Sequence, residues 1–265
     1  MDLRLDGKKA LVTGGSAGIG LAVAEALCAA GCALTLVARD ASRLAAAAGE
    51  LERRFGRPVA TCVRDVGEDA AHQAIAEAHP DIDILVNNAG AIPGGSLDQI
   101  DQARFRAAWD LKVFGFVGMT REYYARMRAR GSGVIVNVIG ASDQRGDPVY
   151  IAGSMGNASL AALTKALGAE APDFGVRVVA VSPGAVFTAR QEGVLRRQAE
   201  IQFGDAERWM DFVRAFPFAR MARPEEVADT VAFLASPRAG YISGTIVNVD
   251  GGMSQRHKWW PNPRG

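Results

Sequence analysis

The stretch that decides the fold is Ala10-Leu-Val-Thr-Gly-Gly-Ser-Ala-Gly-Ile-Gly20. Its opening apolar run is short and aliphatic and leads directly to glycine, which predicts a buried strand. The alanine-rich segment from Ile19 to Ala30 has no internal breaker and predicts a helix. Glycines between a strand and a helix allow a tight turn and let a pyrophosphate approach the amides at the helix N-terminus. The stretch therefore predicts a dinucleotide site, with turn chemistry alone as the alternative.

Composition narrows the class of protein. The chain has 265 residues, of which 49% are hydrophobic and 22% charged, as expected for a globular protein. A net charge of +1 gives no electrostatic reason to expect a nucleic-acid or anionic-membrane partner. The N-terminus has no apolar leader and no run reaches transmembrane length. We expect a cytoplasmic protein that acts on a small molecule.

The cysteines predict neither a disulfide framework nor a metal site. They are Cys28, Cys32 and Cys62, an odd number, and no histidine lies at ligand spacing from them. We expect them to be reduced residues of the core or of turns.

Beyond the first helix, strand and helix patterns alternate to the end of the chain. Further strands are expected at 33–37, 59–63, 82–90, 133–138 and 176–181, and helices at 41–55, 70–78, 102–130, 150–170 and 224–235. No repeat or linker divides the chain, so we expect one domain over residues 1–253. Such alternation predicts an α/β fold: one Rossmann-type, doubly wound parallel sheet of about seven strands, with right-handed crossovers and helices on both faces.

Two motifs give the chain a family resemblance. Thr13 followed by Gly14-x3-Gly18-x-Gly20 resembles the cofactor loop of the short-chain dehydrogenase/reductase family, and Asn87-Asn88-Ala89-Gly90 resembles its second signature. Ser182-Pro183-Gly184 resembles the loop that closes over the nicotinamide, and residues 244–252 resemble the last strand. The resemblance covers about residues 5 to 253. It implies a homotetramer or homodimer that binds a nicotinamide dinucleotide.

The resemblance also assigns the cofactor contacts. They are Gly14, Ser16, Gly18, Ile19, Gly20, Arg39, Asp65, Val66, Asn88, Ala89, Gly90, Asn157, Pro183, Gly184, Val186 and Thr188. Ala38 stands where NAD-preferring relatives carry Asp, and Arg39 follows it. A guanidinium there favours the 2′-phosphate of NADP(H) over NAD(H), with an exposed arginine at a strand end as the alternative.

The family's four catalytic positions have all changed. Counting from the flanking motifs, the tyrosine position is Gly153 and the lysine position is Asn157. The serine position, thirteen residues before the tyrosine, is Gly140, and the asparagine position is Lys112. A glycine offers neither a proton nor a side-chain hydrogen bond to a carbonyl oxygen. The family's usual proton transfer therefore cannot run in this chain.

We hypothesise that the cofactor still binds and that proton handling has moved. Lys112 and Asn157 resemble an exchange of the family's residues, and burial of Lys112 near the cationic nicotinamide would depress its pKa. Tyr150 lies one helical turn before Gly153. Weaker candidates are Ser142 and Asp143, just past Gly140. A surface lysine, a packing tyrosine and ordinary turn chemistry are the respective alternatives.

Three functions remain open at this point. The first is an NADP(H)-dependent oxidoreductase with a non-standard proton-transfer site. The second is a lyase, isomerase or hydrolase using the same cleft, and the third is a cofactor-binding regulator or partner subunit without catalysis. The polar stretch 190–218 takes the place of the family's substrate lid, and 254–265 extends past its usual core. In that extension, Trp259 and Trp260 are expected to pack on a cleft or a neighbouring subunit.

Overall fold

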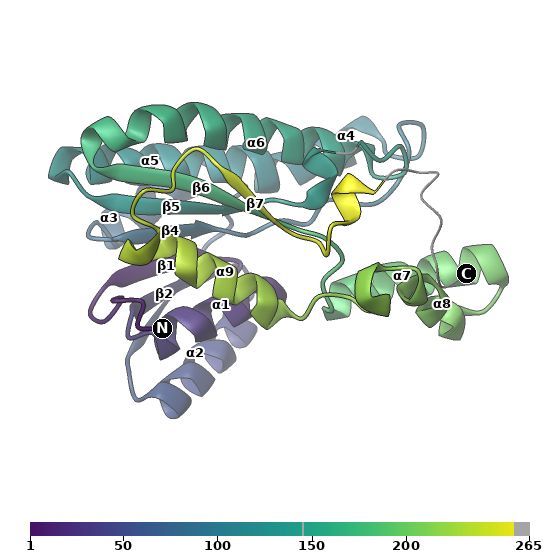
Figure 1. The fold of residues 1–265 in the computed structure, drawn as a ribbon, viewed down its shortest axis with the longest axis horizontal. Coiled ribbons are helices and arrows are strands. Elements are labelled where there is room, and N and C mark those ends of the chain that lie inside the picture. Colours follow the sequence, from purple (N-terminus) through teal and green to yellow (C-terminus); the bar gives the residue numbers. More distant parts are fainter. Residues whose placement is uncertain (145, 257–265) are drawn as a thin grey trace.

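The computed structural model describes residues 1–144 and 146–256, and its centre is a seven-stranded parallel sheet (Figure 1). The strands are β1 Lys9–Thr13, β2 Ala33–Ala38, β3 Val59–Val63, β4 Ile84–Asn87, β5 Gly133–Val138, β6 Val176–Pro183 and β7 Ile246–Val249. They lie in the order β3-β2-β1-β4-β5-β6-β7. The order in which the chain adds strands therefore reverses between β1 and β4, although all strands run parallel. Ligands of such sheets bind beside that point, at the carboxyl ends of the strands.

Helices cover both faces of the sheet (Figure 1). One face packs against α1 Gly18–Ala29, α2 Ala41–Phe55 and α9 Pro224–Ala235, and the other against α3 Asp69–Ala78, α5 Gly115–Arg130 and α6 Ile151–Glu170. Strand β1 shows the division, because Ala10 and Val12 join the first core whereas Leu11 joins the second. The fold class predicted from the sequence is confirmed.

The predicted helix over 102–130 is confirmed in its bounds and contains a π-helical turn that the sequence did not predict. It consists of α4 Gln102–Trp109, a π-helical turn Asp110–Phe114 and then α5. In that turn the Gly115 amide donates to the Asp110 carbonyl five residues back. The wider turn holds one extra residue, and such turns occur often at functional sites. Lys112 lies at its centre, with its side chain buried.

A chain of buried side-chain hydrogen bonds joins the elements on one side of the cleft. The Asn87 amide on β4 donates to Thr120 on α5, at 3.0 Å, and to Asn137 on β5, at 2.9 Å. The Asn137 amide in turn donates to the Thr164 hydroxyl on α6, at 3.0 Å. Because buried polar groups are costly unless paired, these bonds fix how the four elements sit together.

The stretch 190–218 contains α7 Ala189–Phe203 and α8 Met210–Arg214, which extend away from the sheet in Figure 1. Its apolar residues Leu195, Ala199, Trp209 and Val213 form a small cluster with Met221, which follows the stretch. Trp259 and Trp260 lie outside the described residues. Within the described residues, no helix has the length and apolar character needed to cross a membrane.

Candidate active site

The glycine loop between β1 and α1 forms a cradle of backbone. Gly14 and Gly18 have φ angles of +68° and +56°, a region that favours glycine. A Cβ at Gly20 would lie 2.2 Å from the Gly14 carbonyl oxygen, so no side chain fits there. Residue 17, the N-cap of α1, provides no side-chain hydrogen bond, which leaves the first amides of the helix open to an anion. The cradle thus fits a pyrophosphate, and Ser16 and Ile19 lie within it.

The second signature is bonded directly to the first. The Thr13 hydroxyl accepts from the backbone amides of Asn88 and Ala89, at 2.9 and 3.1 Å. The Asn88 side-chain amide donates to the Thr13 carbonyl oxygen at 3.1 Å. The loop after β4, which ends at Gly90, is thereby held against the glycine loop, and the structure brings these predicted cofactor residues together.

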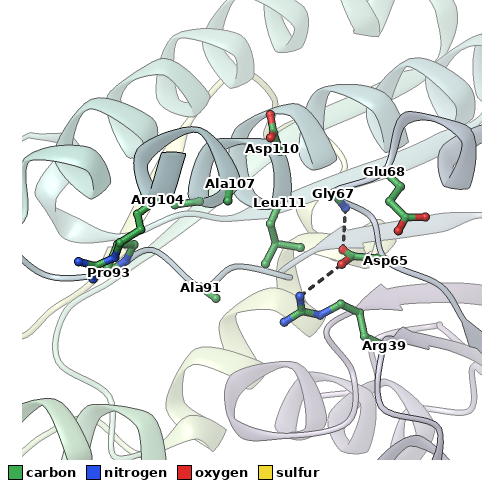
Figure 2. A pocket seen from close by; sticks show the side chains of 11 residues that line it. Arg39, Asp65, Gly67, Glu68, Ala91, Pro93, Arg104, Ala107, Asp110 and Leu111 are labelled. Carbon is green, nitrogen blue, oxygen red and sulfur yellow. Dashed lines mark hydrogen bonds and ion pairs between the residues drawn. The ribbon is translucent and has the colours of Figure 1, made fainter. Parts of the chain in front are cut away.

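A cavity of about 480 Å³ lies beside this junction (Figure 2). At one end, the Arg39 guanidinium forms an ion pair with Asp65 at 3.3 Å, and Asp65 also accepts from the Gly67 amide at 2.9 Å. The Arg39 side chain is 62% exposed, so the ion pair leaves it accessible. Val66 next to Asp65 is buried in the core. Arg104, which the sequence analysis missed, also lines the cavity. The other lining residues are Glu68, Ala91, Pro93, Ala107, Ala108, Asp110 and Leu111.

The loop after β6 faces the glycine loop from the other side. Gly184 donates its amide to Val249 at 3.0 Å, directly after Pro183 at the end of β6. Val186 is buried and forms a bridge with Ala222. Thr188 caps α7 by accepting from the Gln191 amide, and its methyl carbon lies 3.4 Å from where a Cβ at Gly18 would stand. This predicted loop therefore borders the same cleft.

Tyr150 fills the space of a side chain at position 153. A Cβ built on Gly153 would lie 1.9 Å from Cε1 of Tyr150, so the ring occupies that place. The ring packs on the cluster that contains Ile92 and Ala152. Burial raises the pKa of Tyr150, and the nearby positive charge of Arg190 partly opposes that shift. The phenol consequently keeps its proton at neutral pH.

Lys112 is a buried cation at the same edge of the sheet. Its side chain is 7% exposed, and Nζ donates to the carbonyl oxygens of Val138 at 2.8 Å and Ile139 at 3.5 Å. Its Cδ lies 2.7 Å from where a Cβ at Gly90 would stand, so the stem rests against the loop after β4. Burial, with a smaller contribution from the Arg190 charge, lowers the pKa of Lys112 to about 7. Lys112 therefore exchanges a proton near neutral pH.

Asn157 belongs to a small polar group around Gly140. Its Nδ2 donates to the Ser142 hydroxyl at 2.9 Å and lies 2.8 Å from where a Cβ at Gly140 would stand. Asp143 accepts from the Ser182 hydroxyl at 2.9 Å. Asn157 is 4% exposed, and its Oδ1 has no partner among residues 1–144 and 146–256. In that part of the chain Lys112 and Asn157 share no hydrogen bond.

Arg190 is a second site residue that the sequence analysis missed. It stands at the second position of α7, and its Nη1 donates to the Gly90 carbonyl at 2.9 Å. Its Nη2 donates to the Ile92 carbonyl at 2.6 Å. One guanidinium thereby joins the start of the predicted lid to the loop after β4. The sequence held one indication of this role, because Arg190 follows the predicted cofactor residue Thr188 by two positions. The direction of the Arg190 side chain, however, depends on the fold.

Metal binding has no visible basis in the part of the chain that the structure describes. No group of three or more His, Cys, Asp or Glu side chains there could hold an ion. Cys28 and Cys32 are buried and Cys62 is half-buried, and all three are free thiols.

Comparisons with known proteins agree with this geometry. A family model described as enoyl-(acyl carrier protein) reductase matches residues 14–254. The chain is 37% identical over 253 residues to galactitol 2-dehydrogenase (L-tagatose-forming) of Cereibacter sphaeroides, which covers 95% of this chain and 96% of the relative.

Solved structures share the whole fold. L-sorbose reductase from Gluconobacter frateurii, complexed with NADPH and L-sorbose, superposes with a TM-score of 0.89 at 31% identity, covering 97% of this chain and 100% of that one. A 7α-hydroxysteroid dehydrogenase complexed with NADH and 7-oxo glycochenodeoxycholic acid gives a TM-score of 0.83 at 27% identity, covering 95% and 96%. These relatives are oxidoreductases, and the chain belongs to the short-chain dehydrogenase/reductase family.

Proposed function

We propose that this protein is an NADP(H)-dependent oxidoreductase that interconverts a small carbonyl compound and its alcohol, using a proton-transfer site of its own. The observation that carries the proposal is Lys112, a buried amine whose pKa is lowered to about 7, beside a cleft whose cofactor cradle is complete. A general acid or base works best when its pKa lies near the working pH. The family's usual acid, a tyrosine, is absent at Gly153.

The chain's own residues supply each part of the cofactor site. The amides around Gly14, Gly18 and Gly20 would hold the pyrophosphate. Arg39 would turn from Asp65 to the 2′-phosphate, since its side chain is largely exposed. The remaining assigned contacts are Ser16, Ile19, Asp65 and Val66 at the adenosine, and Asn88, Ala89, Gly90, Asn157, Pro183, Gly184, Val186 and Thr188 at the nicotinamide half. The structural relatives do not decide between NADPH and NADH, because one carries NADPH and another carries NADH. The proposed preference for NADP(H) therefore rests on Arg39.

Lys112 and Tyr150 divide the handling of the carbonyl oxygen. When bound, the reduced nicotinamide supplies a hydride to the carbonyl carbon. A protonated Lys112 has three N–H groups, of which two point at the Val138 and Ile139 carbonyls, and the third is left to deliver a proton. Tyr150 keeps its own proton and donates a hydrogen bond that polarises the carbonyl. Ser142 and Asp143 hold the neighbouring loop through Asn157 and Ser182.

Calorimetric titration with NADPH and, separately, with NADH is the first test. We expect tight binding of NADPH and weak binding of NADH, followed by cofactor oxidation when carbonyl compounds are added. Binding without turnover on any carbonyl or alcohol would favour the regulator, a function that the four changed catalytic positions also fit. Product without a change in cofactor absorbance would favour a lyase, isomerase or hydrolase. No binding of either dinucleotide would refute the proposal.

A further inference from the structure

The buried Lys112 and the exposed Arg190 lie on either side of Gly90, and neither is paired with a carboxylate of the described chain. Neither Lys112 nor Arg190 forms an ion pair with a carboxylate of residues 1–144 and 146–256, although most of the arginine-rich surface of α7 and α8 is paired. The acidic side chain nearest in sequence to the changed serine position, Asp143, is bonded to the Ser182 hydroxyl. Both cations are instead held by backbone carbonyls.

Arg190 acts on the reaction side of the cleft rather than on its adenosine side. One of its two acceptors is Ile92, which belongs to the apolar cluster on which Tyr150 packs. Its other acceptor is Gly90, against which the stem of Lys112 rests. A guanidinium has five N–H groups, and the carbonyls of Gly90 and Ile92 account for two. Three remain, in the planar fork that matches a carboxylate.

The site also needs something to position its substrate. Gly140 and Gly153 supply no hydroxyl to hold a carbonyl oxygen, and Asn157 is turned to Ser142. Correct positioning of the substrate contributes as much to the reaction rate as the proton donor does, because the reacting atoms must be held close together. A bidentate contact from Arg190 to a second group of the substrate would replace the lost hydroxyls.

We propose that Arg190 is the specificity residue of this cleft and that the substrate is an oxo acid, held by a carboxylate–guanidinium contact beside the reacting carbonyl. The inference rests on the proposed oxidoreductase function. In the reaction a hydride from the reduced nicotinamide adds to the carbonyl carbon, and a proton adds to the oxygen. The carboxylate is unchanged, so the products are a hydroxy acid and the oxidised cofactor.

The test compares acids with their neutral counterparts. A panel of oxo carboxylic acids and the corresponding primary amides is assayed with NADPH on the wild-type enzyme, on Arg190→Met and on Arg190→Lys. We expect Arg190→Met to lower kcat/KM for the acids about 10- to 100-fold, mainly through KM, and for the amides less than about threefold. Arg190→Lys should restore part of the loss. Arg197→Met, at an exposed arginine two turns further along α7, is the matched control and should change neither.

Other outcomes overturn the assignment. An equal loss on acids and amides would make Arg190 a strut that only holds α7 to the loop after β4. Weaker NADPH binding by Arg190→Met, in calorimetry, would assign the guanidinium to the cofactor. Should no carbonyl be turned over, binding of the oxo acids to the NADP⁺-loaded protein is measured directly. If the wild-type protein binds the oxo acids and Arg190→Met does not, the carboxylate site stands although the redox function fails. If the wild-type protein does not bind them, the carboxylate site is refuted as well.

Discussion

Gly20 in the cofactor half of the cleft differs from Gly153 and Gly140 in the reaction half in what its missing Cβ would meet first. In the cofactor half, the missing Cβ of Gly20 would meet backbone, the Gly14 carbonyl oxygen at 2.2 Å. In the reaction half, the missing Cβ atoms would meet side chains: Tyr150 at Gly153, and Asn157 at Gly140. A glycine pressed against backbone is required by the turn itself. A glycine pressed against a neighbouring side chain leaves room that this side chain fills. The space beside Gly153 and Gly140 is therefore occupied by other side chains and is not an empty cavity.

This difference limits what each half says about function. The cofactor half would keep its glycines for folding alone, so their presence supports a dinucleotide site without proving it. The reaction half carries the stronger information, because a lysine with only 7% exposure costs free energy to bury, and this burial lowers its pKa to about 7.

The largest effect is expected in the reaction half, from Lys112→Met. Methionine fills the volume of the stem but carries no proton, so kcat for carbonyl reduction should fall by about 10²–10⁴-fold. The dissociation constant for NADPH, measured by calorimetry, should stay within about threefold. Lys165→Met, at an exposed lysine on α6, serves as the control. Turnover that survives Lys112→Met would remove Lys112 from the mechanism.

In the cofactor half, Gly20→Ala should damage both binding and stability. The added methyl would overlap the Gly14 carbonyl, and overpacking of this kind costs about 1–3 kcal/mol. We expect a lower Tm and an NADPH affinity reduced about tenfold or more, both read from thermal melts with and without the cofactor. Gly49→Ala on α2 has open space around it and should be neutral or slightly stabilising. Equal behaviour of the two variants would contradict the tight cradle.

Arg39→Ser tests the cofactor preference with a smaller effect. Losing a charge-assisted contact to a phosphate costs about 1.5–3 kcal/mol, or about 10- to 100-fold in the dissociation constant for NADPH. The constant for NADH should change less than about threefold, because NADH has no 2′-phosphate. Calorimetry with both dinucleotides measures the ratio. A parallel loss for both would show that Arg39 acts through Asp65 on the pocket rather than on the phosphate.

The pH dependence gives the most specific signal. The pKa of Lys112 is lowered from 10.5 to about 7, so between these values the unfolded chain binds a proton that the folded protein has released. The free energy of unfolding therefore rises with pH in this window, by at most about 1.4 kcal/mol per pH unit. Below pH 7 the amine is protonated in both states, and this rise is absent. Lys112→Met should lack this rise in denaturant titrations at pH 7 and pH 9. Carbonyl reduction should likewise decline above about pH 7 in the wild-type enzyme, and identical unfolding profiles would contradict the buried amine.

Local patterns predicted most of the fold and rather less of the site. Strand 133–138 and helix 41–55 were predicted with the bounds that the structure has, because aliphatic runs and alanine-rich amphipathic segments carry their own period. The π-helical turn was missed, since one widened hydrogen bond leaves no trace in a helical pattern. Arg190 was missed because its two acceptors lie about a hundred residues away in the chain.

The buried hydrogen bonds among Asn87, Thr120, Asn137 and Thr164 have a consequence for local opening. They connect β4, β5, α5 and α6, so we expect amide protons in these four elements to exchange with solvent more slowly than those elsewhere. The α7–α8 segment has a small cluster of its own, and we expect its amides to exchange faster. Opening of the start of α7 would then move Arg190 while Asn157 on α6 stays in place.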